Sequence, residues 1–149
     1  MALKNAASDI AAKLTGNTVG GQALVSGQNL FSTPAFPQSW SISVVCLNSD
    51  GGAPEPYIGA AAQKAILRPT VQVLVYAPPG EAGFTDGETL ARAIVAALQQ
   101  ATGYGTPAAI STLIRGSAPI YVGIDEATNQ HVWSSNFEVV YEGTVDTFS

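Results

Sequence analysis

The sequence predicts an α+β fold: a mixed, mainly antiparallel β-sheet with two α-helices packed on one face, plus a β-hairpin extension and long loops. Two amphipathic helical patterns and about five strand-like runs, separated by turn residues, lead to this prediction. The 149 residues are 46% hydrophobic, enough apolar material for a buried core without metal or disulfide staples. We therefore expect a single domain over residues 1–149.

Residues 1–15 are predicted to form an N-terminal helix. Their apolar side chains recur at spacings of three and four residues and share one face: Leu3, Ala6, Ile10 and Leu14. The pattern stops before Gly16. In residues 16–39 glycines and prolines interrupt the apolar residues, and we interpret this segment as a long loop or a short edge structure.

Residues 40–141 are expected to hold the sheet and the second helix. Trp40–Leu47 alternates between apolar and polar residues and is predicted to be a strand that ends in the turn 48–52. Ala53–Leu67 begins with two prolines and continues with an alanine-rich run, so we interpret it as a loop that carries a short helical turn.

Arg68–Ala77 is the clearest strand, and Pro78-Pro79-Gly80 closes it. Three valines share one of its faces, which is expected to meet the core. Leu74 and Tyr76 lie on the other face, which indicates that a neighbouring chain covers part of that face.

The second helix is predicted to begin with a capping box, in which Thr85 is the N-cap and Glu88 follows three residues later. Gly103 is expected to end this helix. Its apolar face is formed by Leu90, Ile94, Ala97, Leu98 and Ala101.

Three further strands are predicted at residues 110–114, 120–124 and 136–141, followed by a C-terminal tail at 142–149. The polar run 125–129 is interpreted as the tip of a hairpin. Tyr121, Asp125 and Trp133 are expected near the base of that hairpin.

The residues that most enzyme chemistry requires are missing, so we expect no catalytic, cofactor-binding or metal-binding residues. The single histidine, His131, has no second histidine or cysteine nearby to complete a zinc site. No Gly-x-Ser-x-Gly motif places a serine nucleophile. Cys46, the single cysteine, lies in an apolar run and is interpreted as a small buried hydrophobe.

Composition favours contacts with protein over contacts with nucleic acid or membrane. Only 11% of residues are charged, the net charge is −5, and no run of Lys or Arg could neutralise a phosphate backbone. No apolar stretch approaches the length that crosses a bilayer. The first residues contain no apolar leader segment, so we expect a protein that begins in a cytosol.

Charged residues at strand ends and turns are the candidate interface residues. Arg68 and Arg115 could form ion pairs between subunits with Glu81, Asp125 or Glu126, and Tyr57 completes the set. The alternative stays open that these are ordinary exposed arginines, which contribute little to stability.

The order of motifs resembles that of bacteriophage minor capsid and tail terminator proteins, over residues 2–141. The chain matches in its N-terminal helix, its Pro-containing loop and its amphipathic second helix. The motifs that carry the resemblance are Val44–Leu47 running into Asp50-Gly51-Gly52-Ala53-Pro54, Arg68-Pro69-Thr70-Val71-Gln72-Val73, Pro119-Ile120-Tyr121-Val122-Gly123-Ile124-Asp125-Glu126, and the final strand around Ser135–Val139.

The resemblance implies a structural virion protein that closes into a homo-oligomeric ring, usually sixfold. Such a ring sits at the head-proximal end of a tail tube, ends tube polymerisation and joins tail to head. Expected partners are the tail tube protein and a head-completion or neck protein, and DNA would pass through the lumen without specific binding. Assembly would take place in the host cytoplasm, and the finished protein would reside in the virion tail or neck.

The segments 52–67 and 16–38 are longer than in that family, and we interpret these loops as one candidate patch for contacts between ring subunits. The hairpin at 125–130 is expected to contact a neighbour or to face the tube. Two other classes stay open: a different head–tail connector protein of the same particle, and a ligand-binding domain.

Overall fold

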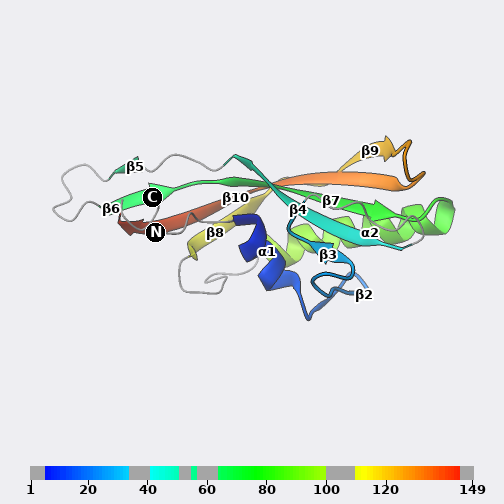
Figure 1. Cartoon of the computed structure of the whole chain (residues 1–149), viewed down its shortest axis with the longest axis horizontal. Coiled ribbons are helices and arrows are strands. Elements are labelled where there is room, and N and C mark those ends of the chain that lie inside the picture. Colours follow the sequence, from blue (N-terminus) through cyan, green and yellow to red (C-terminus); the bar gives the residue numbers. More distant parts are fainter. Residues whose placement is uncertain (1–5, 34–40, 51–54, 57–63, 100–109, 145–149) are drawn as a thin grey trace.

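The computed structural model describes residues 6–33, 41–50, 55–56, 64–99 and 110–144, which form an elongated molecule built on one long sheet (Figure 1). Within these residues there are two helices, α1 (Ala6–Leu14) and α2 (Glu81–Gln99). The strands are β1 (Thr18–Val19), β2 (Gln22–Ala23), β3 (Leu30–Phe31), β4 (Ser43–Asp50), β5 (Glu55–Pro56), β6 (Lys64–Leu67), β7 (Thr70–Ala77), β8 (Ile110–Gly116), β9 (Ile120–Ile124) and β10 (His131–Thr144).

The long strand β10 organises the sheet. On one side it pairs with β7 through residues 131–138 and then with β6 through residues 141–144; on the other side it pairs with β9 and then with β8. β4 continues the sheet beyond β7, and β3 pairs with β4 at the edge. The β3–β4 pair is parallel and the other named pairs are antiparallel, so the mixed, mainly antiparallel sheet of the α+β prediction is confirmed.

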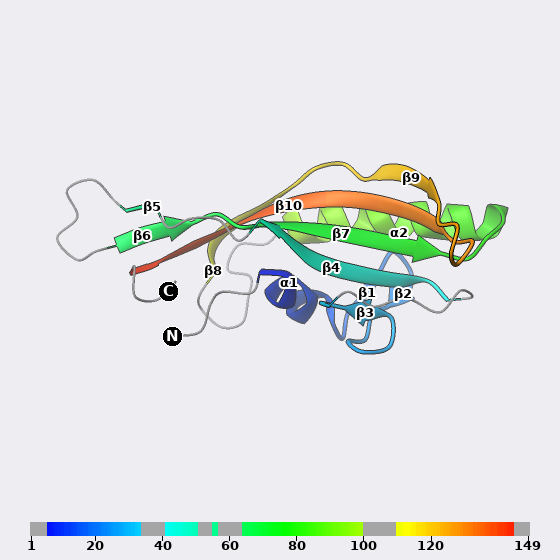
Figure 2. The ribbon, with the colours of Figure 1, turned by 45° about the horizontal axis from the view of Figure 1, so that its top comes forward.

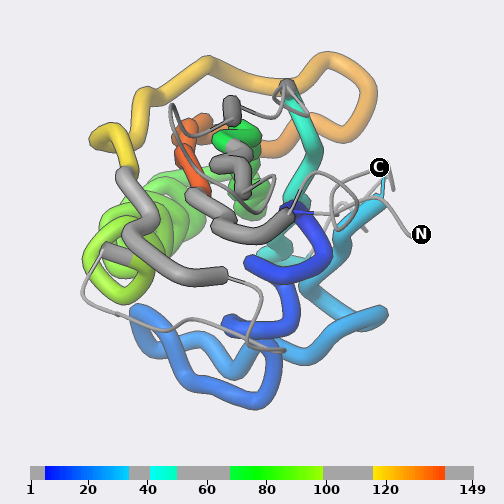
Figure 3. Tube along the Cα trace, turned by 90° about the vertical axis from the view of Figure 1, so that its left-hand side faces the viewer, coloured from blue at the N-terminus to red at the C-terminus, as the bar shows by residue number. Residues whose placement is uncertain are grey.

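Both helices pack on one face of this sheet, as predicted, and the end-on view shows the sheet above them (Figure 3). Val71, Val73 and Val75 alternate with half-buried residues along β7 and enter the core, which confirms the predicted face. The backbone N–H of Ala7 donates to Asn48 Oδ1 at 3.0 Å and joins the start of α1 to β4. This bond satisfies one of the donors that a helix leaves unpaired at its first turn.

The two ends of the molecule differ (Figures 1 and 2). At one end β5, β6 and residues 141–144 of β10 project beyond both helices; we call these strands the arm. At the other end the β9–β10 hairpin lies beside the start of α2. We call residues 78–88 and 120–134 the hairpin end.

The described part of the predicted loop 16–39 contains β1 to β3, so the short edge structure considered from the sequence is present. Leu24 and Leu30 are fully buried in the common core. Gly20 packs closely against α2, because a Cβ added to Gly20 would be 3.0 Å from the Cα of Leu90. Residues 16–33 are thus packed against the core of their own chain, and Val25–Gln28 are exposed.

Several predicted boundaries are wrong. The predicted loop 53–67 ends in a strand, because Lys64–Leu67 pairs with both β10 and β5, and the alanine-rich residues 59–63 lie outside the described residues. The first predicted strand continues to Asp50, and β10 runs from His131 to Thr144, so residues 142–144 belong to the sheet and not to a tail. Trp40, Gly103 and residues 1–5 lie outside the described residues.

The second helix begins at Glu81, four residues before the predicted N-cap. The carbonyl of Gly80 accepts the backbone N–H of Phe84 at 3.0 Å, so Gly80 stands at the start of the helix. Thr85 lies inside the first turns, and its hydroxyl donates to the carbonyl of Glu81 at 3.1 Å. The predicted apolar stripe is confirmed at Leu90, Ile94 and Leu98, which are buried. It is wrong at Ala97, which is exposed because it lies off the buried face, and Ala101 lies outside the described residues.

Candidate interaction surface

The edge strand β9 exposes large apolar side chains. Ile120, Val122 and Ile124 are 67%, 64% and 55% exposed. Within the described residues β9 pairs only with β10, so the outer edge of its backbone faces away from the sheet. Native proteins usually shield such an edge with charge, proline or a cover, because an exposed apolar edge recruits another strand. This combination is typical of a protein–protein contact.

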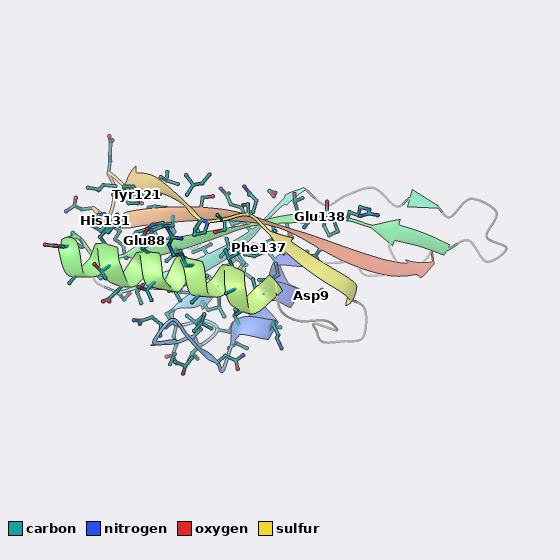
Figure 4. All side chains as sticks on the ribbon, turned by 180° about the vertical axis from the view of Figure 1, so that it is seen from behind. Asp9, Glu88, Tyr121, His131, Phe137 and Glu138 are labelled. Atoms are coloured by element: carbon teal, nitrogen blue, oxygen red, sulfur yellow. The ribbon has the colours of Figure 1, made fainter. Side chains whose placement is uncertain are left out.

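An aromatic cluster holds β9 in place from the helix side. The rings of Phe84, Tyr121, His131 and Trp133 lie at centroid distances of 5.2 to 6.0 Å, mostly edge to face or tilted. Figure 4 shows Tyr121 and His131 together at this end. The residues come from α2, β9 and β10, so the cluster joins the exposed edge strand to the helix.

The hydrogen bonds of His131 fix its orientation. Its Nε2 lies 3.0 Å from the carbonyl of Gly80, which can only accept, so Nε2 carries a hydrogen. In the neutral ring Nδ1 then accepts the Tyr121 hydroxyl at 2.9 Å. His131 therefore acts as a structural link between α2, β9 and β10, and these two bonds involve neither a serine nor Asp125.

A pocket of about 300 Å³ adjoins β9 on the face that the helices leave uncovered. It is lined by Tyr76, Val122, Gly123, Ile124, Asp125 and Val132. Burial raises the pKa of the Tyr76 hydroxyl, and the negative charge of Asp125 raises it further, so this hydroxyl stays protonated. The pocket thus combines apolar walls with one hydroxyl and one carboxylate.

The predicted hairpin tip is confirmed, and Asp125 stabilises it. One carboxylate oxygen accepts the backbone N–H of Ala127 at 3.0 Å, and the other accepts the Thr128 hydroxyl at 3.1 Å. Asn129 adopts a positive φ of 58°, a conformation that asparagine tolerates better than most residues. Glu126 is exposed at the tip.

The predicted interface residues fall into two groups that lie apart. Arg68 pairs with Glu138 within the chain at 3.8 Å, and Arg115 stands opposite the same Glu138 in the β8–β10 register. Glu81, Asp125 and Glu126 lie at the hairpin end, whereas Figure 4 shows Glu138 well along the sheet from Tyr121. Tyr57 lies outside the described residues.

Charge is distributed unevenly between the two ends. The hairpin end contains five acidic residues and no Lys or Arg: Glu81, Asp86, Glu88, Asp125 and Glu126. Along α2 beyond it, Arg92 pairs with Glu88 at 3.4 Å. The sequence of the arm holds one basic and two acidic residues, Lys64, Glu55 and Glu142, and Arg68 follows the end of β6.

The sequence interpretation missed the exposure of β9 and the roles of Phe84 and His131. The sequence signal for this exposure was the run Ile120-Tyr121-Val122-Gly123-Ile124. Its apolar residues do not alternate with polar ones, although the run leads into an exposed turn. The cluster had no such signal, because Phe84 and His131 meet only after α2 folds back against the hairpin.

Cys46 is confirmed as a buried residue, since its exposed fraction is 0%. Burial raises the pKa of its thiol from the ordinary value of 9.0 to about 12. Because the thiolate is the reactive form, we expect native Cys46 to react with iodoacetamide at about pH 8 roughly a thousandfold more slowly than in the denatured chain. Mass spectrometry of the labelled protein measures this, and fast labelling without denaturant would contradict it.

Neither a comparison with models of known protein families nor one with curated proteins finds a match for this chain. Among the described residues no group of three or more His, Cys, Asp or Glu is arranged to hold a metal ion. Neither α1 nor α2 combines the length and apolarity that a membrane span requires.

Proposed function

We propose that this chain is a structural virion protein that forms a ring, a homohexamer by its family resemblance, at the head-proximal end of a phage tail tube. The ring would end polymerisation of the tube and join tail to head. The observation that carries this proposal is the outer edge of β9, with which no strand pairs in the described part of the chain, together with the exposure of Ile120, Val122 and Ile124 by more than half. An edge of this kind suits permanent contact with another protein.

The elongated form supports a ring. A closed ring requires two different patches on each subunit, and the arm and the hairpin end, which lie at opposite ends of the molecule, would supply them. The low content of charged residues, 11%, also suits surfaces that become covered on assembly.

The proposed partners follow from the same resemblance: the tail tube protein on one side of the ring and a head-completion or neck protein on the other. DNA would pass through the lumen without specific binding. The net charge of −5 favours this, because an acidic lining would repel the phosphate backbone. The proposed location is the tail or neck of the virion.

The mass of the purified protein in solution tests the proposal. Light scattering over a concentration series should find a particle of about six chains, and negative-stain imaging should show a ring with a central hole. If the protein stays at the single-chain mass of 15.3 kDa, it should still bind the ends of isolated tail tubes. A monomer that binds no tube end would contradict the proposal, and binding to portal rings alone would favour a different connector role.

A further inference from the structure

We propose that the hydroxyl of Tyr121 is an activated nucleophile, at which this chain accepts an acyl group from an uncharged, activated acyl donor. His131 is the base that takes up the proton of this hydroxyl. The inference concerns the unassembled chain and does not depend on the proposed ring, because it rests on contacts between the hairpin and the start of α2.

Three groups stand in the order that a base-assisted nucleophile requires: a hydroxyl, a base within hydrogen-bond reach, and a third group that orients the base. The Tyr121 oxygen lies 2.9 Å from His131 Nδ1, and His131 Nε2 lies 3.0 Å from the carbonyl oxygen of Gly80. Because that oxygen can only accept, the hydrogen of the neutral ring is on Nε2 and the lone pair of Nδ1 faces the hydroxyl. The backbone of Gly80 thus selects the tautomer in which His131 is a base toward Tyr121.

The Tyr121 side chain is both accessible and held in place. Tyr121 is 41% exposed, and its bond to His131 lies at the surface. The ring of Phe84 meets the Tyr121 ring edge to face at a centroid distance of 5.2 Å, and the indole of Trp133 lies at 5.3 Å. These contacts keep the hydroxyl near Nδ1, and such positioning raises the rate of an attack that needs both groups.

Charge selects the class of donor. The hairpin end contains five acidic residues and no Lys or Arg. Phosphoryl and nucleotidyl donors are anions, which this end repels, and it offers no Lys or Arg to stabilise the group in transfer. An uncharged acyl donor, such as an acyl imidazole or an aryl ester, approaches without this repulsion.

In the transfer the Tyr121 oxygen attacks the acyl carbon and forms an ester bond, while its hydrogen passes as a proton to His131 Nδ1. The bond between the acyl carbon and the leaving group breaks, and the leaving group departs with the electron pair. His131 then holds a hydrogen on each nitrogen and returns the added proton to the leaving group. The ester oxygen cannot donate, so acylation also removes the hydrogen bond that joins β9 to His131.

Acetylation with N-acetylimidazole, followed at each tyrosine by mass spectrometry, tests the inference at a concentration where the chain is monomeric. A free tyrosine amide in the same solution is the reference. Tyr121 should react at least about tenfold faster than this reference, because a positioned base contributes about 10²–10⁴ and partial burial offsets some of this gain. Tyr76 should react more slowly than the reference, because burial and the charge of Asp125 raise the pKa of its hydroxyl.

The variant His131→Gln separates the base from the structural link. A glutamine side chain can donate and accept hydrogen bonds but cannot take up the proton, so the rate at Tyr121 should fall by about tenfold or more. The matched control is Ala127→Gln, at the exposed tip of the same hairpin, which should leave this rate unchanged. Thermal unfolding checks that both variants fold.

The wild-type reaction in D₂O gives a second test that needs no substitution, because a step that transfers a proton is slower with deuterium. Equal rates at Tyr121 in H₂O and D₂O would overturn the inference. Equal rates in the wild-type chain and in folded His131→Gln would also overturn it, as would a rate at Tyr121 no higher than that of the reference. None of these results bears on the ring, which is judged from the mass of the assembly.

Discussion

Replacing Trp133 with alanine is expected to lower the free energy of unfolding by about 3–5 kcal/mol, the range for removal of a large aromatic side chain from a core. Trp133 is 2% exposed and packs between the sheet and α2, with the ring of Phe84 at a centroid distance of 5.2 Å. Its loss leaves a cavity that neither the β-sheet nor the helix can close without breaking backbone hydrogen bonds. Chemical denaturation at a concentration where the chain is monomeric measures the change.

The matched control for Trp133 is Ile124→Ala on the same hairpin. Ile124 is 55% exposed, so in the monomer its truncation should change the free energy of unfolding by no more than about 0.5 kcal/mol. Equal losses for the two variants would mean that Trp133 is not a core residue of the monomer. The same comparison separates stability from assembly, because only Ile124 lies on the proposed contact surface.

The parts of the fold that could be predicted from sequence are those where periodicity and burial agree. Val71, Val73 and Val75 alternate as a half-buried strand must, and Leu90, Ile94 and Leu98 follow the helical period. Asp125–Asn129 is a turn because its residues can bond their own backbone. In each case the secondary structure that the local sequence pattern favours is also the one that the position in the fold requires.

Elsewhere tertiary contacts determined the secondary structure, and the local sequence pattern did not predict it. β6 follows an alanine-rich run and is a strand because it pairs with β10. The helix begins at Glu81 because the turn at Gly80 supplies the first carbonyl, which overrides the capping signal at Thr85. Local propensity is a weak predictor of secondary structure wherever tertiary contacts favour a different conformation.

The candidate site was predictable only in part. The hairpin and the acidic residues at its tip follow from sequence, but the partner of Arg68 does not, because strand register places Glu138 beside it. The exposure of β9 depends on its position at the sheet edge, outside β10, and a sequence of apolar residues cannot distinguish an edge strand from a central one. The order of the strands in the sheet was therefore the information that a prediction of this site from sequence lacked.

Gly87→Ala is expected to lower the free energy of unfolding by about 1–3 kcal/mol, although alanine is the better helix former. Helix propensity alone would predict a gain of about 1 kcal/mol in α2. A Cβ at Gly87, however, would overlap the indole of Trp133 and lie 2.7 Å from the Cβ of Ala77, so the helix would have to move off the sheet. The sign of the change, measured by denaturation, therefore decides between propensity and packing.

The control is Thr89→Ala, at an exposed position of the same helix. This substitution should raise the free energy of unfolding by a few tenths of a kcal/mol, since packing does not oppose it.

The two core substitutions should also be coupled. In the Trp133→Ala background most of the overlap is gone, so Gly87→Ala should be less destabilising there than in the wild-type chain, by roughly 1–2 kcal/mol. A double-mutant cycle measures this difference, and strictly additive effects would show that the close approach of α2 to the sheet does not depend on this contact. Because Trp133 also contacts the rings of Tyr121 and Phe84, the coupling links the packing of α2 to the strand edge on which the proposed ring depends.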